Sequence, residues 1–375
     1  MKVRTEKVVL VTGADGFVGR NLQVALSRRQ DLTVECYDLS NEEELLAEQV
    51  ARADVIFHLA GVNRPTQPAE FTEGNAALTQ RLVEMLRARS TAPRVLMPSS
   101  IQADFNNPYG VSKKAAEDAL RAYARDCGAY VKIYRLPGIF GKWSRPNYNT
   151  VVATFCHNIA RALPIEISEP GRSIELVYID DLVDEMLGFI DEEPSPDAGF
   201  CRVKKVYRIT LQDLAGRIQS FERMRRTLVL PDMSDELTAR LHSTYLSFLP
   251  EDQFSYVVDV KTDERGDLFE LLKSASAGQV FLSRTKAGIT RGNHYHDMKV
   301  EKFCVVRGRA VIRFRSVLRS DIIEYPVSDK RIEVVDIPPG YAHNIENVGD
   351  DEMIVLFWSS QQFDPLRPDT HFLKV

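Results

Sequence analysis

Cysteine is scarce in this sequence, and no apolar run is long enough to cross a membrane. The five cysteines are scattered and never form a C-x-x-C pair. This pattern argues against a disulfide framework and a cysteine-based zinc site, and it is typical of reduced thiols in the cytoplasm. The apolar run before the first glycine turn is too short for a signal-peptide core. Because runs of about 18 apolar residues are absent, we expect no membrane span and a cytoplasmic protein.

Basic blocks are absent as well. The formal net charge is -5, and the sequence lacks the electrostatic footprint of a nucleic-acid-binding protein. Apolar residues make up 44% and charged residues 27% of the chain, which is typical of a soluble globular protein. The chain of 375 residues is longer than a domain with a single hydrophobic core usually is, so we expect two domains.

The first half of the chain alternates short apolar runs with amphipathic stretches. Continuous Val, Ile and Leu runs of this kind are typical of strands buried on both faces of a parallel sheet. They cover residues 8–12, 33–37, 54–60, 94–98 and 130–136. Between these runs, apolar residues recur at helical spacing in three segments, which we expect to be helices: 21–29, 75–89 and 112–126. The alternation predicts an α/β domain with a Rossmann-type, doubly wound parallel sheet.

The pattern changes after about residue 203. Two further helices are expected, one with Thr210 and one with Ser234 as its N-cap. Residues 250–253 are typical of a linker, and short β-rich runs with turn signals follow from Phe254 onward. This second pattern predicts an all-β barrel or sandwich. We therefore expect one domain over residues 1–249 and another over 250–375.

A glycine-rich turn follows the first predicted strand. Gly13, Gly16 and Gly19 stand between that strand and a helix. Glycines there allow a tight turn and a close backbone approach to a pyrophosphate, which the helix N-terminus attracts. The spacing predicts a dinucleotide site, and the alternative is an ordinary glycine-rich turn.

A tyrosine and a lysine stand four residues apart in a predicted helix. Tyr109 and Lys113 therefore share one helix face. Ser99 and Ser100 follow the preceding strand. A phenol becomes a usable acid–base group near neutral pH only beside a positive charge. The pair is thus a candidate acid–base site, and the alternative is two solvated or packed side chains.

Three histidines and one glutamate gather in the predicted β domain. His294 and His296 are two apart, so on a strand they point to the same side. With Glu301 and His343 they offer three imidazoles and one carboxylate, a ligand set suited to zinc, nickel, iron or manganese. The alternative is a metal-free barrel in which these histidines pack or form hydrogen bonds.

The first domain resembles the extended short-chain dehydrogenase/reductase family, on its glycine turn, the HLAG run at 58–61 and the Tyr109–Lys113 pair. The resemblance implies that Tyr109 donates a proton to a carbonyl as hydride arrives. Lys113 would hold the nicotinamide ribose and lower the pKa of Tyr109. Ser100 would orient the substrate oxygen, with Ser99 as the rival for that role. Contacts to the cofactor are implied for Gly13, Gly16, Phe17, Gly19, Asp38, Leu59, Ala60, Tyr109 and Lys113.

Cofactor and substrate details stay open at this point. Asp38 could bind the ribose, which would favour NAD, or it could leave room for the 2′-phosphate of NADP. Arg172 could contact a diphosphate in place of an arginine that the family carries nearby. The loop after the strand at 130–136 offers nucleotide-sugar contacts, or else it is a solvated polar loop. Its candidate residues are Lys142, Arg145, Asn147 and Asn149.

The second domain closely resembles the cupins, on the runs that hold the four ligand residues. The whole chain resembles the CapF/WbjC-type bifunctional enzymes of capsular and O-antigen polysaccharide synthesis, also through HLAGVNRP, PSSIQ, RGNHYH and KFCVV. That resemblance implies that the cupin epimerises C3 of a UDP-2-acetamido-2,6-dideoxy-4-hexulose. The reductase domain would then reduce C4 with NADPH, giving UDP-2-acetamido-2,6-dideoxy-L-talose, a precursor of UDP-N-acetyl-L-fucosamine.

Further expectations follow from this resemblance. The metal is expected to be zinc, because the cupin reaction is proton chemistry and not redox. Tyr295, Asp297, Lys299 and His371 are candidate bases. A homodimer is expected. Competing hypotheses are a different 4-keto nucleotide sugar, a cupin that serves only structure or dimerisation, and a nucleotide-sugar sensor with a decayed reductase.

Overall fold

The computed structural model describes residues 6–67, 69–194, 200–259, 261–263, 266–268, 278–361 and 366–375. Its contacts divide the chain into two compact units. Unit 1 comprises residues 1–150 and 174–208, and unit 2 comprises 151–173 and 209–375. Among the described residues, no helix combines the length and apolar character needed to cross a bilayer.

Unit 1 is built on a six-stranded parallel sheet with the order β2-β1-β3-β4-β5-β8. The strands are β1 (Lys7–Thr12), β2 (Leu32–Tyr37), β3 (Val55–His58), β4 (Arg94–Ser100), β5 (Val131–Leu136) and β8 (Phe200–Cys201). The predicted doubly wound sheet is therefore confirmed. The strand order reverses between β1 and β3, and ligands of such sheets bind where the strands at this point end.

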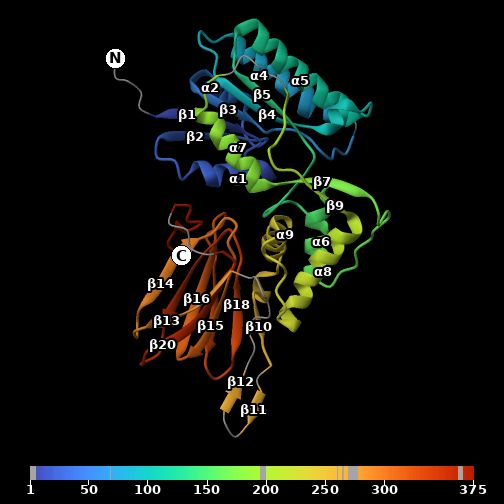
Figure 1. The fold of residues 1–375 in the computed structure, drawn as a ribbon. Helices are drawn as coiled ribbons and strands as arrows, with labels where there is room; N and C mark the ends of the chain where they lie inside the picture. Colours follow the sequence, from blue (N-terminus) through green and yellow to red (C-terminus); the bar gives the residue numbers. More distant parts are fainter. Residues whose placement is uncertain are drawn as a thin grey trace. The chain divides into compact units, whose positions relative to one another are not determined.

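Helices cover both faces of this sheet (Figure 1). They are α1 (Phe17–Leu26), α2 (Glu43–Arg52), α4 (Leu78–Arg87), α5 (Pro108–Cys127) and α7 (Ile179–Asp191). The core joins strands to α2, α4 and α5 through Leu46, Leu82 and Leu120, which are at most 1% exposed. On the other face, α1 contacts α7.

Some helix starts differ from the predictions. Helix α1 begins at Phe17 and not at Asn21, because Gly16 already serves as its N-cap. Before α4, the short helix α3 (Ala69–Phe71) continues into a π-helical turn over Thr72–Ala77. Helix α5 begins earlier than predicted, because Asn107 caps it and Pro108 occupies its first turn. Tyr109 therefore lies in the first turn of α5.

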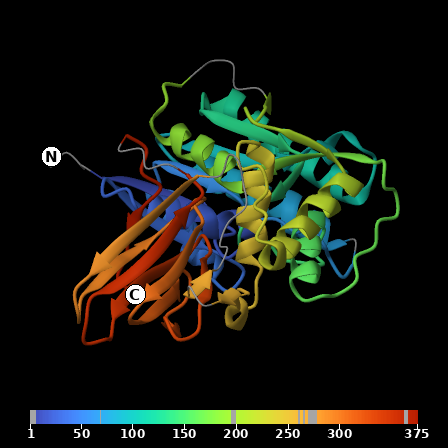
Figure 2. The same ribbon diagram turned by 60° about the horizontal axis from the view of Figure 1, so that its bottom comes forward.

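Unit 2 combines a layer of three helices with a β-barrel, which is described below. Helices α6 (Val151–Ala160), α8 (Leu211–Thr227) and α9 (Glu236–Ser247) contact one another, and both ribbon views show α8 and α9 side by side (Figures 1 and 2). Thr210 caps α8, as predicted, by accepting from the Asp213 N–H at 3.1 Å. The predicted cap of α9 was wrong. Asp235 accepts from the Thr238 N–H at 2.8 Å, whereas the Ser234 hydroxyl turns back to Asp232.

The barrel consists of two five-stranded antiparallel sheets, ordered β10-β18-β15-β20-β13 and β17-β16-β19-β14-β21. The first holds β10 (Ser255–Val257), β13 (Gln279–Thr285), β15 (Glu301–Arg307), β18 (Glu333–Ile337) and β20 (Met353–Ser359). The second holds β14 (Thr290–Tyr295), β16 (Arg309–Ser316), β17 (Ile322–Ser328), β19 (Tyr341–Asn347) and β21 (His371–Phe372). The predicted all-β fold is confirmed.

Polar contacts attach the helical layer to the barrel within unit 2. The Asp336 carboxylate is fully buried and lies 2.5 Å from Lys302 Nζ and 3.3 Å from Arg225 Nη1 of α8. The Ser243 hydroxyl of α9 donates to the Met298 carbonyl at 2.7 Å. Residues 209–249 thus group with the barrel by contact. The boundary expected at 249/250 remains a prediction about the two folding domains.

Candidate functional site

The glycine turn of unit 1 has no space for side chains at Gly13 and Gly19. Gly13 has φ +68°, and a Cβ atom there would lie 2.6 Å from the Ala60 Cα atom. A Cβ on Gly19 would collide with the Gly13 carbonyl oxygen. No side chain caps the N-terminus of α1. The turn therefore has the shape that a dinucleotide pyrophosphate requires.

Other predicted cofactor residues lie at the same edge of the sheet. Asp38 follows β2, and its Oδ2 accepts from the Asp15 N–H of the glycine turn at 2.7 Å. Leu59 and Ala60 follow β3, and their N–H groups donate to the carbonyl and hydroxyl oxygens of Thr12 at 3.1 and 3.3 Å. The structure thus brings these residues together around the strand ends, while their contacts with a cofactor remain predictions.

Tyr109 and Lys113 share the face of α5 that points to the end of β4. Lys113 Nζ donates to the Pro98 carbonyl at 3.2 Å. Burial lowers the pKa of Lys113 to about 8, although Glu117 opposes this shift. Burial also raises the pKa of Tyr109, and the neighbouring Ser100 only partly offsets this effect. The lower pKa expected for Tyr109 is therefore absent in this structure.

The two neighbouring serines have different partners. The Ser99 hydroxyl donates to Glu117 Oε1 at 2.5 Å, and Glu117 is fully buried and ion-paired with Arg135 at 2.6 Å. Ser100, in contrast, accepts from the Gln102 N–H at 3.1 Å, and it lies close enough to Tyr109 to lower the pKa of that phenol. The geometry favours Ser100 over Ser99 as the hydroxyl that would orient a substrate oxygen.

Sequence reasoning missed a buried residue that supports α5, the helix of the predicted Tyr109–Lys113 pair. Asn75, in the π-helical turn, donates from Nδ2 to the Ser112 hydroxyl at 3.0 Å and to the Val62 carbonyl at 3.0 Å. The Ser112 hydroxyl in turn donates to the Tyr109 carbonyl at 2.8 Å. π-Helical turns inside helices are frequent at functional sites. In the sequence, the only hint of this role is that a polar asparagine stands inside an apolar helical pattern. Nothing in the sequence indicates the π-helical turn.

His58 forms a second buried network. Thr79 Oγ1 donates to the Asn75 carbonyl at 2.7 Å and lies 2.9 Å from His58 Nε2. His58 Nε2 must therefore carry the proton, and Nδ1 accepts from Thr12 Oγ1 at 2.9 Å. Burial lowers the pKa of His58 to about 3. His58 is thus a neutral structural link between β1, β3 and α4.

The predicted substrate loop is already engaged with its neighbours. Lys142 is 2% exposed, and its Nζ lies 2.6 Å from Asp180 Oδ1. The Arg145 guanidinium lies over the Tyr148 ring at 4.9 Å. The first contact holds Lys142 beside the end of β7 (Ser173–Tyr178), and substrate binding by Lys142 and Arg145 remains a prediction.

The two asparagines of this loop adopt left-handed backbone conformations. Asn147 and Asn149 both have φ +57°. Asn149 Nδ2 donates to the Asn63 carbonyl at 3.1 Å, and the Asn147 carbonyl accepts from Arg64. The loop is therefore joined to the segment that follows β3. Arg172 is exposed and belongs to unit 2, and its contact with a diphosphate remains a prediction.

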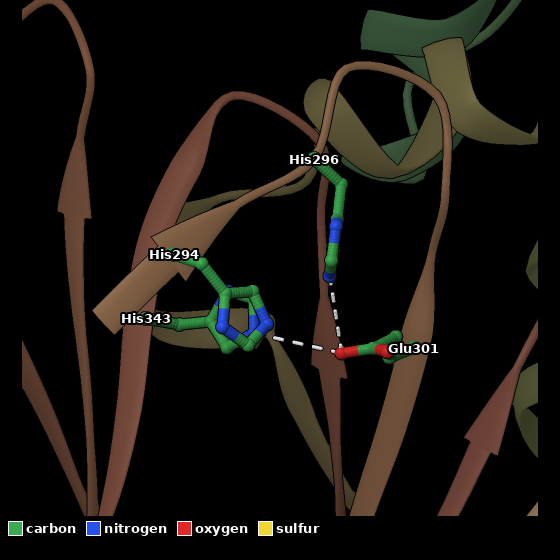
Figure 3. Close-up of side chains that lie close together, drawn as sticks. All are labelled: His294, His296, Glu301 and His343. Carbon is green, nitrogen blue, oxygen red and sulfur yellow. Dashed lines mark ion pairs between the residues drawn. The ribbon is translucent and has the colours of Figure 1, made fainter. Parts of the chain in front are cut away.

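The four predicted metal ligands converge in the barrel of unit 2 (Figure 3). His294 lies on β14, His296 just after it, His343 on the paired strand β19 and Glu301 at the start of β15. One ligand atom from each residue lies within 4.8 Å of all the others. Glu301 Oε2 is 3.2 Å from His296 Nε2 and 3.5 Å from His343 Nε2. The side chains therefore point toward one another from both sheets.

The protonation pattern prepares these histidines to bind a cation. His296 Nδ1 lies 2.5 Å from the Asp369 carbonyl, and His343 Nδ1 lies 3.2 Å from the Tyr341 carbonyl. Nδ1 must donate in both cases, so each Nε2 carries a lone pair. Burial lowers the pKa of His294 to about 3 and also lowers the pKa of His343.

A divalent cation fits these residues. The Nε2 atoms of His296 and His343 are buried without a hydrogen-bond donor or acceptor among the described residues, and an apolar ring, Phe303, lies 5.7 Å from the His343 ring. Ligands about 2.0–2.1 Å from a tetrahedral ion lie about 3.3 Å apart. The measured separations of 3.2 and 3.5 Å agree with that value.

The candidate bases divide into two groups. The rings of Tyr295 and His371 are tilted against each other, with centroids 5.2 Å apart, and His371 Nε2 lies 3.6 Å from Asp297 Oδ2. His371 thus contacts the other two residues of this group. Lys299 Nζ, in contrast, lies 3.9 Å from Glu301 Oε1, and it is therefore next to one of the four ligand residues.

Comparison with family models matches both halves of the chain. The NAD dependent epimerase/dehydratase family matches residues 9–199, and the polysaccharide biosynthesis C-terminal domain matches residues 261–371. The first match covers the glycine turn and the Tyr109–Lys113 pair, and the second covers the four ligand residues.

Relatives match the full length. The UDP-2-acetamido-2,6-beta-L-arabino-hexul-4-ose reductase of Pseudomonas aeruginosa is 45% identical over 367 residues, which is 98% of each chain. The crystal structure of the capsular polysaccharide assembling protein CapF from Staphylococcus aureus is 44% identical, with a TM-score of 0.68 over 98% of this chain and 100% of that one. The UDP-glucuronic acid 4-epimerase of Bacillus cereus in complex with NAD is 17% identical over 57% of this chain and 83% of that one, with a TM-score of 0.52, and shares the fold.

Proposed function

This chain belongs to the NAD dependent epimerase/dehydratase family and, over its full length, to the CapF-type enzymes, and we propose that it converts a UDP-linked 4-keto sugar in two steps. Unit 2 epimerises C3 of a UDP-2-acetamido-2,6-dideoxy-4-hexulose. Unit 1 then reduces the C4 ketone to give UDP-2-acetamido-2,6-dideoxy-L-talose, for capsule or O-antigen synthesis. The observation that carries the proposal is one polypeptide with both a Ser100–Tyr109–Lys113 group and a convergent three-histidine, one-carboxylate group.

In the reduction, Tyr109 donates its phenolic proton to the C4 oxygen. Ser100 holds that oxygen, and Lys113 binds the nicotinamide ribose and places positive charge near Tyr109. A bound reduced nicotinamide supplies the hydride. The resemblance implies NADPH, whereas the Asp38 carboxylate at the glycine turn favours NADH, because it would accept from a ribose hydroxyl and repel a 2′-phosphate. The P. aeruginosa relative is named as a reductase of a hexul-4-ose, which supports this step.

The chemistry of the sugar fixes the order of the two steps. The C3 proton is acidic only while C4 is a ketone, because the negative charge left on C3 delocalises onto the C4 oxygen. His294, His296, Glu301 and His343 would hold a divalent cation, expected to be zinc. Such a cation supplies positive charge for an oxygen on which negative charge develops. Lys299, beside Glu301, is the proposed group that moves the proton. Reduction at C4 ends the acidity, so epimerisation comes first.

The proposed assembly is a cytoplasmic homodimer. The edge strand β13 exposes Val280 and Leu282 by 52% and 62%, and an edge strand with exposed apolar residues is suited to burial against another chain.

One incubation tests both steps. The protein is mixed with UDP-2-acetamido-2,6-dideoxy-4-hexulose in deuterated water, with NADPH, with NADH or with neither. We expect deuterium at C3 in all three incubations. We expect cofactor oxidation in only one of them, the one that contains the nicotinamide that unit 1 binds. Cofactor oxidation without deuterium incorporation at C3 would indicate that the barrel has only a structural role. Deuterium incorporation without cofactor oxidation would contradict the proposed reductase activity.

A further inference from the structure

The last residues of the chain lie directly against the strand that carries the metal-ligand histidines. Strand β21 pairs with β14, with His371 beside Tyr295 and Phe372 beside His294. The Leu373 N–H donates to the Asn293 carbonyl at 2.9 Å. Residues 369–373, here termed the C-terminal clasp, therefore run along the segment 293–299.

Asp369 anchors the clasp through its carboxylate. Oδ1 accepts from the Asp297 N–H at 2.8 Å, and Oδ2 accepts from the N–H groups of Met298 and Lys299 at 2.9 and 2.6 Å. The side chain is 16% exposed. Three backbone donors on one carboxylate define the path of the loop between β14 and β15, which is the loop that follows His296 and leads to Glu301.

The Asp369 main chain reaches a metal ligand directly. Its carbonyl oxygen lies 2.5 Å from His296 Nδ1, which is 1% exposed in the barrel. A hydrogen bond at Nδ1 fixes both the tautomer and the rotation of an imidazole. The lone pair of Nε2 then faces Glu301, 3.2 Å away.

A neighbouring contact brings the clasp close to the second ligand. Thr370 Oγ1 accepts from Lys299 Nζ at 3.0 Å, and the same Nζ lies 3.9 Å from Glu301 Oε1. The clasp thus borders three of the four ligand residues: His294 through the pairing with β14, His296 through the Asp369 carbonyl, and Glu301 through Lys299.

Asp369, Asp297 and His371 also form a group with metal-ligand residue types. Both oxygens of Asp369 already accept hydrogen bonds from backbone N–H groups, which compete with a cation for the same lone pairs. This group is therefore better explained as a structural anchor than as a second metal site.

We propose that Asp369 is a positioning residue for cation binding in the barrel. Its carboxylate holds the loop at 297–299, and its carbonyl orients His296 toward the other ligands. The proposal rests on the metal site of the proposed function. Removal of the carboxylate should free the clasp, loosen the Nδ1 contact and weaken cation binding by about 10–100-fold.

The test measures cation affinity in full-length protein. Zn²⁺ affinity is determined by competition with a chromophoric chelator for the unchanged protein, Asp369→Ala, Asp369→Asn and Asp350→Ala. Asp350 is a matched control, because its side chain is 97% exposed and lies 3.4 Å from Arg309. We expect about 10–100-fold weaker binding for Asp369→Ala, a smaller loss for Asp369→Asn, which keeps one acceptor oxygen, and no change for Asp350→Ala.

A second readout needs no metal. Hydrogen exchange of the Met298 and Lys299 amides in the metal-free protein should accelerate in Asp369→Ala and not in Asp350→Ala. Unchanged affinity in both Asp369 variants would overturn the proposal, and so would equal losses in Asp369→Ala and Asp350→Ala. If Asp369→Ala does not fold, Asp369→Asn decides by the same criteria. Zn²⁺ binding by none of the proteins, the unchanged one included, would instead remove the metal site on which the proposal rests.

Discussion

The backbone at Gly13 and the backbone at Ala60 approach each other so closely that a Cβ atom on Gly13 would lie 2.6 Å from the Ala60 Cα atom. Gly13 follows β1 and Ala60 follows β3, so the contact closes the point where the strand order of the sheet reverses. The glycine is therefore required for two reasons, its φ of +68° and the lack of space.

Replacement of Gly13 by alanine should abolish nicotinamide cofactor binding. Gly128 is a matched control, because it has φ +63° but a Cβ atom there would meet no heavy atom within 4 Å. Both variants should lose about 1–2 kcal/mol from left-handed backbone strain, and only Gly13→Ala should also displace Ala60. Isothermal titration with NADPH and NADH measures the difference. Equal cofactor affinity in the two variants would argue against the site.

Replacement of Tyr109 by phenylalanine should separate the two proposed reactions. Loss of a general acid slows a reaction by about 10²–10⁴-fold, so cofactor oxidation should fall by that range. Deuterium incorporation at C3 should persist, because the ligand residues of the barrel are unchanged. The control is Tyr130→Phe, which removes a phenol bonded to Glu192 at 2.7 Å. If proton exchange at C3 stopped in Tyr109→Phe, the proposed division of labour would be wrong.

Replacement of His296 by alanine should remove the metal. Three remaining ligands bind zinc more weakly than four, and a buried Glu301 loses its nearest imidazole. Elemental analysis after gel filtration should show about one zinc per chain in the unchanged protein and a small fraction of that in the variant. His157→Ala, in α6 and half-buried, is the control. Unchanged metal content in His296→Ala would contradict the ligand assignment.

His242 should make unit 2 sensitive to acid. Burial lowers the pKa of His242 from 6.5 to about 3, so the unfolded chain binds this proton at a higher pH than the folded one. The stability contribution is complete above pH 6.5 and is lost as the pH falls from 6.5 toward 3. At pH 5 the loss amounts to about 2 kcal/mol. Urea unfolding of the full chain at pH 7.5 and 5 should show a smaller decrease for His242→Leu, and an equal decrease in both proteins would contradict the assignment.

The sequence was sufficient to predict the parts in which local pattern and chemistry agree. The parallel sheet follows from apolar runs such as that of β1, which is buried on both faces. The cluster of His294, His296, Glu301 and His343 could be anticipated, because imidazoles and a carboxylate in one β-rich segment have few other uses, while their role as metal ligands stays a prediction. The same applies to the Thr210 cap, where a hydroxyl precedes a helical apolar pattern.

Other features depend on contacts that the local sequence does not contain. The register of β14 shifts between Gly292 and His294, with Asn293 at φ +62°, and this bulge helps set the direction of the first ligand. The regular alternation of side-chain direction along a strand does not predict this bulge. The hydrogen bond of Ser99 likewise depends on Glu117, 18 residues further along the chain. The Asp369 carbonyl contacts His296 although the two residues lie more than seventy positions apart in the sequence. No local sequence pattern predicts such a contact.

The two compact units alternate along the chain, with junctions at 150/151, 173/174 and 208/209. A cut at any one junction therefore produces fragments that each lack a piece of their own unit or retain a piece of the other. Limited proteolysis that stopped at a single nick would leave the pieces associated under native conditions. Separate production of either half would require a redesigned connection and not a simple truncation.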